Sequence, residues 1–66
     1  MKLYEFTVPE LIKFRELCNF TEDELVYFNM KSKNKSHIEI AFELHVSLAQ
    51  VSKLSKRVRS KIIRVI

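Results

Sequence analysis

The sequence predicts a small all-α domain of four helices, preceded by a short extended arm and without a β-hairpin wing. The chain has no glycine and one proline, whereas tight β-hairpins need residues that accept a positive φ. Four segments repeat apolar residues at helical spacing, which is typical of helices with one buried face. Ser or Thr precedes three of these segments, as helix N-caps do. A chain of 66 residues forms a single domain, residues 1–66.

Residues 1–8 are predicted to be the extended arm. Tyr4, Phe6 and Val8 alternate with polar residues, which is a strand pattern. A lone strand is not stable in water, and a domain this small often depends on a second subunit. We therefore expect the arm to pair with its copy in a homodimer.

The next two segments predict two helices, whose ends are marked by residues typical of helix starts and stops. Pro9 suits the first position of the first helix, and Asn19 suits a left-handed stop after it. Thr21 and Glu24 form a capping box, so the second helix is expected over about Glu22–Lys31. Its inward residues are expected to be Leu25 and Phe28.

Two further helices are joined by a very short turn. Ser36 caps a helix over 37–44, and Ser47 caps a last helix over 48–64. The inward side chains expected for the shorter helix are Ile38, Ala41 and Leu44. In the turn, His45 stands where glycine is usual, so we expect a positive φ there with a strain of about 1 kcal/mol.

The last helix separates an apolar edge from a basic face when it is drawn at 100° per residue. The apolar edge consists of Leu48, Val51, Leu54, Val58, Ile62 and Val65. The other side carries Ala49, Lys53, Lys56, Arg57, Ser60 and Arg64, flanked by Ser52 and Arg59. No acid occurs from Ser47 to the end, although solvated helices commonly mix acids with bases for i,i+4 pairing.

Acidic and basic residues are also distributed unevenly between the two halves of the chain. Residues 1–30 hold three Lys or Arg against six acids, and residues 31–66 hold nine against two. A basic half on a small domain indicates a polyanionic partner, although it is also compatible with a surface that is merely solvated.

The segment Ser36–Ile62 resembles the helix-turn-helix of LuxR-type regulators and of sigma-factor region 4. The resemblance extends to the helix in front, Thr21–Lys31. The matching stretches are FTEDE, which opens that helix, KSHIEIAFEL, and the V-S-x-x-x-V that begins at Val46. The resemblance implies a bacterial or phage transcription regulator whose second motif helix enters the major groove of double-stranded DNA. It assigns base contacts to Leu48, Ala49, Ser52 and Lys53. It assigns phosphate contacts to Lys35, Ser36, Ser47, Lys56 and Arg57.

Other kinds of site find little support in the sequence. Cys18, His37 and His45 do not have zinc-site spacing, so no metal is expected. No cofactor, small-molecule ligand or catalytic constellation is expected either. A single cysteine suits a reducing, cytoplasmic setting, and no apolar run is long enough to cross a membrane.

Several apolar side chains have no obvious place in the core and suggest protein contacts. The main candidates are Phe42 and Tyr27, because Phe42 lies away from Leu44 on its helix. The candidate oligomer contacts are Tyr4, Phe6, Phe42, Ile63 and Ile66. The alternative function is therefore a protein-interaction module on the same scaffold, with RNA polymerase or a phage component as partner.

Overall fold

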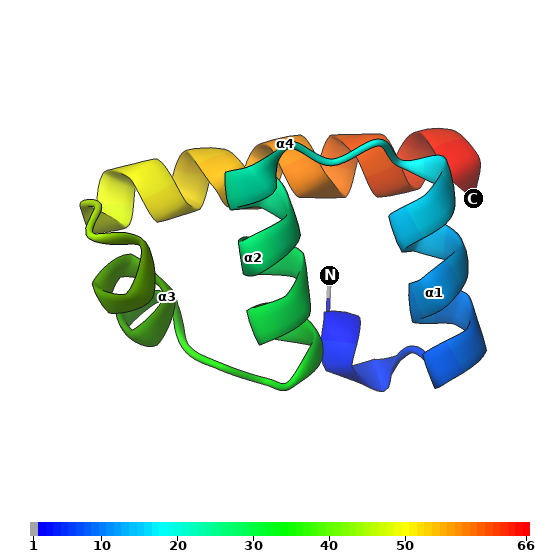
Figure 1. Ribbon diagram of the computed structural model, residues 1–66, viewed down its shortest axis with the longest axis horizontal. Helices are drawn as coiled ribbons and strands as arrows, with labels where there is room; N and C mark the ends of the chain where they lie inside the picture. The colour runs from blue at the N-terminus through cyan, green and yellow to red at the C-terminus, as the bar shows by residue number, and fades with distance from the viewer. Residues whose placement is uncertain (1) are drawn as a thin grey trace.

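Four α-helices and one short 3-10 turn make up the protein, in a computed structural model that describes residues 2–66 (Figure 1). The elements are η1 (Leu3–Glu5), α1 (Val8–Leu17), α2 (Glu22–Ser32), α3 (His37–Leu44) and α4 (Leu48–Val65). No strand occurs within residues 2–66, so the predicted all-α class is confirmed. The two helices next to the tight turn begin where they were predicted, and α4 ends one residue later.

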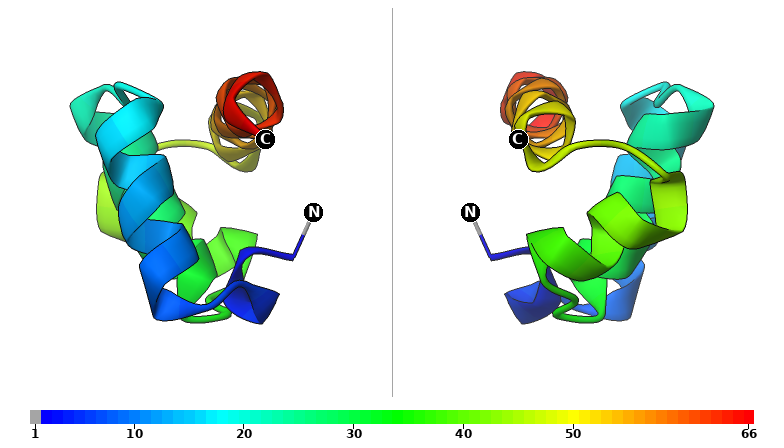
Figure 2. Two further views of the ribbon diagram at one scale, coloured as in Figure 1. Left: turned by 90° about the vertical axis from the view of Figure 1, so that its right-hand side faces the viewer. Right: turned by 90° about the vertical axis from the view of Figure 1, so that its left-hand side faces the viewer.

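Helix α4 is the long element against which the others pack. The helices α3, α2 and α1 follow one another along it from its N-terminal to its C-terminal end (Figure 1). In the end-on views the rest of the chain lies to one side of α4, and its other side is open (Figure 2). The side chains with the least exposure sit at this junction: Phe28, Ile40, Val51, Val58 and Ile62.

All three connections between the α-helices use the same local pattern. Each contains one residue with a positive φ, then one further residue, then the Thr or Ser that caps the next helix. The positive-φ residues are Asn19 (50°), Asn34 (61°) and His45 (56°). The predicted left-handed conformations of Asn19 and His45 are therefore confirmed. Asn and His are among the residues that tolerate this region best when glycine is absent.

The first residues of the helices explain where each one begins. Thr7 with Glu10, Thr21 with Glu24, and Ser36 with Glu39 form three capping boxes. Ser47 accepts a hydrogen bond from the Gln50 amide at 3.3 Å. Each cap satisfies backbone N–H groups that the helix itself leaves without partners.

The predicted extended arm is wrong for the residues that the structure describes. Leu3–Glu5 form a 3-10 turn, and Val8 already belongs to α1 because Thr7 caps that helix. Leu3 is buried at 3% exposure, and η1 packs on α2. Phe6 packs edge-on against Phe14, with their ring centroids 5.1 Å apart. These residues reach the core by a turn because the strand pattern has no neighbouring strand to pair with.

Two other predictions about buried side chains also fail. Leu25 is 37% exposed, and Ile38 is 64% exposed, while Ile40 is fully buried. Helix α3 turns Ile40 and Leu44, one helical turn apart, toward the core, so Ile38 faces outward. Tyr27, which was considered as a partner contact, is 4% exposed and belongs to the core.

Substitutions at His45 test the left-handed turn. We expect His45→Gly to be more stable than His45→Ala by about 1 kcal/mol, because alanine is strained at φ 56° and glycine is not. Urea denaturation of both variants measures this difference. At Glu43, an exposed position inside α3, the same pair should show the opposite order. Equal stabilities of the two His45 variants would contradict the assignment of strain to this turn.

Candidate nucleic-acid interface

The open side of α4 carries a continuous exposed surface, which we call the basic face. Helical geometry sets it opposite the buried residues Val51, Leu54, Val58 and Ile62. It consists of the exposed residues Ala49, Ser52, Lys53, Lys56, Arg57, Ser60 and Arg64. Small residues therefore lie between the cations along the helix, so that a ligand could approach the α4 backbone closely.

The cations of the basic face have no acidic partners among residues 2–66. The ion pairs within this part of the chain are Lys2–Glu5, Lys35–Glu39 and Lys61–Glu24. None of them involves Lys53, Lys56, Arg57 or Arg64. Asp23 lines a small pocket with Arg57 but forms no ion pair with it. Cations outside ion pairs favour an anionic ligand.

A partly buried ion pair beside this face joins α4 to α2. Glu24 is 2% exposed, and its Oε1 accepts hydrogen bonds from the Lys61 ammonium and from the Thr21 amide. The Lys61 Nζ also donates to the Asn19 carbonyl at 3.3 Å. Burial raises the pKa of Glu24, but the hydrogen bonds from Lys61 and Thr21 outweigh it, so that its pKa lies below the ordinary value. Lys61 is thus engaged with Glu24 and with the end of α1.

A shallow hollow forms where this ion pair meets the basic face. It is lined by Glu24, Lys56, Arg57, Ser60, Lys61 and Arg64. Since Lys61 already binds the Glu24 carboxylate, the cations of the hollow that take part in no described ion pair are Lys56, Arg57 and Arg64.

The predicted base contacts lie together at the start of α4. Leu48 is 51% exposed, and Ala49, Ser52 and Lys53 are also exposed. Ser47 is exposed as well, although its hydroxyl caps the helix. These residues occupy the first two turns, the part of such a helix that reaches base edges when it docks into a groove.

The predicted phosphate contacts divide into two groups. Lys56 and Arg57 belong to the basic face, next to the base-contact candidates. Lys35 and Ser36 lie at the opposite end of α3 from the turn, about 12 Å along that helix. Lys35 pairs with Glu39 at 3.8 Å, and the Ser36 hydroxyl takes part in the capping box. The structure therefore does not join the two groups into one surface.

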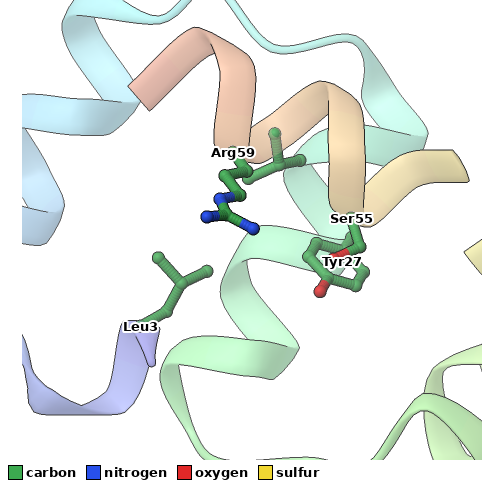
Figure 3. A pocket seen from close by; sticks show the side chains of 5 residues that line it. Leu3, Tyr27, Ser55 and Arg59 are labelled. Atoms are coloured by element: carbon green, nitrogen blue, oxygen red, sulfur yellow. The ribbon is translucent and has the colours of Figure 1, made fainter. Parts of the chain in front are cut away.

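Arg59 lies on the flank of α4 rather than on its open side. With Leu3, Tyr27, Ser55 and Val58 it lines a small cavity of about 70 Å³ between α4, α2 and η1 (Figure 3). The hydroxyl of Tyr27 is hydrogen-bonded to Nε2 of His37 at 3.2 Å. Burial, and to a smaller extent Lys31, lowers the pKa of His37. His37 is therefore engaged with the core at the start of α3.

The candidate oligomer contacts fall in separate places. Phe42, the most exposed of them at 83%, lies on α3. Phe6 is half-buried and shares an apolar groove with Leu17 and Ile66 near the C-terminal end of α4. Ile63 is exposed on the last turns of α4, and Tyr4 belongs to η1. No single surface unites all five.

The Glu24–Lys61 pair was not expected from the sequence, where Glu24 was assigned only to a cap. One signal was available: Glu24 and Phe28 are four residues apart, so they share one face of α2.

Cys18 is the free cysteine of the core. Burial raises the pKa of its thiol, which leaves the thiol unreactive.

Comparison with known proteins adds no relative: no family model matches the chain, and neither the curated proteins nor the solved structures contain a significant match. Within the part of the chain that the structure describes, no three His, Cys, Asp or Glu side chains are grouped as a metal site would require. None of the helices described has the length and apolar character needed to span a membrane.

The pH dependence of stability tests the Glu24–Lys61 pair. Because the pKa of Glu24 is lower in the folded protein, its contribution is present above the unfolded value near 4.5 and is lost as the pH falls through the folded value. We expect Glu24→Gln, which keeps a capping residue, to flatten the decline in urea midpoint between about pH 6 and pH 3. The exposed neighbour substitution Glu22→Gln should keep the slope of the wild-type protein. Parallel profiles for wild type and Glu24→Gln would exclude this role for the pair.

Proposed function

We propose that the protein binds double-stranded DNA as a small transcription regulator and inserts α4 into the major groove. The observation that carries this proposal is the basic face of α4, which is open along the helix and has no acidic partners among the described residues. A polyanion with a regular groove is the ligand that such a straight, cationic helix fits best.

The dimensions of α4 support insertion into a groove. An α-helix is about 10–12 Å across with its side chains, and the major groove is about 12 Å wide. Ala49 and Ser52 are small and exposed in the first two turns, so the backbone can approach the base edges. In this position Leu48 and Ala49 contact thymine methyl groups, while Ser52 and Lys53 offer hydrogen bonds.

Phosphate contacts extend the interface along the same helix. Lys56 and Arg57 follow the base-contact residues by one turn, and Ser60 and Arg64 continue the basic face. Phosphate contacts position a protein on DNA without reading its sequence, and they supply a large part of the affinity. With few side chains able to make bidentate base contacts, the sequence preference is expected to be modest.

A homodimer would increase both affinity and specificity. Two copies of α4 about 34 Å apart would enter successive major grooves on one side of the duplex. The candidates for the dimer contact are the exposed residues Ile63 and Ile66 at the C-terminal end of α4. We further propose that the protein acts in the bacterial or phage-infected cytoplasm, by covering a promoter or by contacting RNA polymerase.

Charge removal on the basic face tests DNA binding. We expect Lys53→Ala and Arg57→Ala each to weaken binding to duplex DNA and to reduce the dependence of log affinity on log salt by about 1. Fluorescence anisotropy with a labelled duplex at several salt concentrations measures both quantities. Lys13→Ala removes the same charge from the exposed side of α1 and should leave the salt slope unchanged. If the wild-type protein binds no member of a random duplex library at low salt, the proposed function is wrong.

The contact with thymine methyl groups has a chemical test of its own. In the duplexes selected from that library, replacing single thymines by uracil removes only the methyl group. We expect a loss of about threefold to tenfold in affinity at the positions that Leu48 contacts, because one buried methyl contributes about 1 kcal/mol. The Leu48→Ala variant should lose this discrimination. Selected sites without thymine, or an equal response of both proteins, would argue against the assignment of Leu48.

A further inference from the structure

The outward side of α3 carries an apolar pair that neither the core nor the basic face of α4 uses. Ile38 and Phe42 are one helical turn apart and are 64% and 83% exposed. Glu39 and Glu43 are exposed beside them, also one turn apart. We call these four residues the α3 patch.

The stability of the domain does not explain the apolar members of the α3 patch. The inward side of α3 already supplies Ile40, Ala41 and Leu44 to the core. Phe42 has the largest exposed fraction among the large apolar side chains of the described residues. Phenylalanine and isoleucine are also poorer helix formers than the polar residues that exposed helix positions usually hold. Adjacent exposed apolar side chains on a short helix therefore indicate a contact surface.

The charges around Phe42 narrow the choice of partner. Residues 31–66 contain only two acids, Glu39 and Glu43, and both belong to the α3 patch. Glu39 is partly occupied by Lys35 and by its capping box, but Glu43 takes part in none of the ion pairs found between residues 2 and 66. The two acids of this basic half thus lie beside its single phenylalanine.

We infer that the α3 patch is a docking surface for a second, different protein, which offers an apolar pocket edged with lysine or arginine. Ile38 and Phe42 would enter the pocket as anchors at i and i+4, the spacing that a helix uses in a groove. Glu39 and Glu43 would meet the basic edge and reject acidic partners. The inference goes beyond DNA binding and does not require it.

The same charges argue against a second copy of this chain as the occupant. Two α3 helices that pack about a two-fold axis through Ile38 and Phe42 would bring Glu39 of one chain toward Glu43 of the other. Like charges at such a contact are unfavourable. A partner docked on the α3 patch also leaves the basic face of α4 free, because α3 contacts α4 through its inward side.

Peptide selection provides the test, with a random library of 16-residue peptides displayed on phage as the probe. The wild-type protein is immobilised in moderate salt, and selected peptides are synthesised for measurement of affinity. We expect enriched peptides to combine apolar residues with Lys or Arg. Their affinity should fall at least tenfold for Phe42→Ser and should fall with rising salt for the wild type. Glu43→Gln should reduce both the affinity and its dependence on salt.

Two controls separate the α3 patch from the rest of the molecule. Ile12→Ser removes an exposed apolar side chain from α1 and should leave peptide binding unchanged. Phe42→Ser should retain the wild-type thermal midpoint, as expected for a side chain exposed to this extent, and should retain affinity for duplex DNA. A failure of DNA binding in the wild type would reject the proposed function without touching this inference.

Three results would overturn the inference. The first is the absence of any enriched peptide, or of any difference between wild type and Phe42→Ser. The second is enrichment of acidic peptides, which contradicts the chemistry of the partner. The third comes from sedimentation equilibrium: if the wild type self-associates and Phe42→Ser does not, the occupant is a second copy of the chain.

Discussion

The ion pair between Glu24 and Lys61 joins α2 to α4 and supports the orientation in which α4 turns its basic face to solvent. It is the one place where a charged side chain of α2 is buried, and its partner comes from the far half of α4. Lys61 meets Glu24 on the α2 side, which agrees with the rotation of α4 that buries Val51, Val58 and Ile62. The neighbouring cations Arg57 and Arg64 then face solvent together with the rest of the basic face. Removal of the Lys61 ammonium would leave the buried Glu24 carboxylate without its cation, which is unfavourable by about 1–3 kcal/mol.

Much of the architecture follows from local rules and could be predicted from the sequence. The caps at Thr21, Ser36 and Ser47, and the left-handed conformations of Asn19 and His45, depend on residues within a few positions of each other. The separation of α4 into a buried edge and a basic face depends only on helical periodicity. Both kinds of signal are contained in short windows, so no knowledge of the tertiary arrangement is needed to interpret them.

The failures have the opposite origin, because they depend on contacts between distant segments. The extended arm was predicted only from the alternation of apolar and polar residues. In the structure, η1, which contains Leu3, packs on α2, and Phe6 packs on Phe14. For α3, the expected stripe ran through Ile38, whereas packing on α4 buries Ile40. The candidate oligomer contacts lie far apart on the surface. This could not be predicted without knowing how the helices that carry them pack together. These are tertiary choices that override local preference.

The short glycine-free turns also have a consequence for the order in which the domain assembles. Each connection between α-helices spans only three or four residues, so closing it loses little chain entropy, and neighbouring helices can meet within microseconds. The α3–α4 unit is the most local of these pairings. By contrast, the contacts of Lys61 with Glu24 and Asn19 join residues 37 and 42 positions apart and must form late. The contacts of the C-terminal half of α4 are therefore expected to form after the α3–α4 unit has assembled.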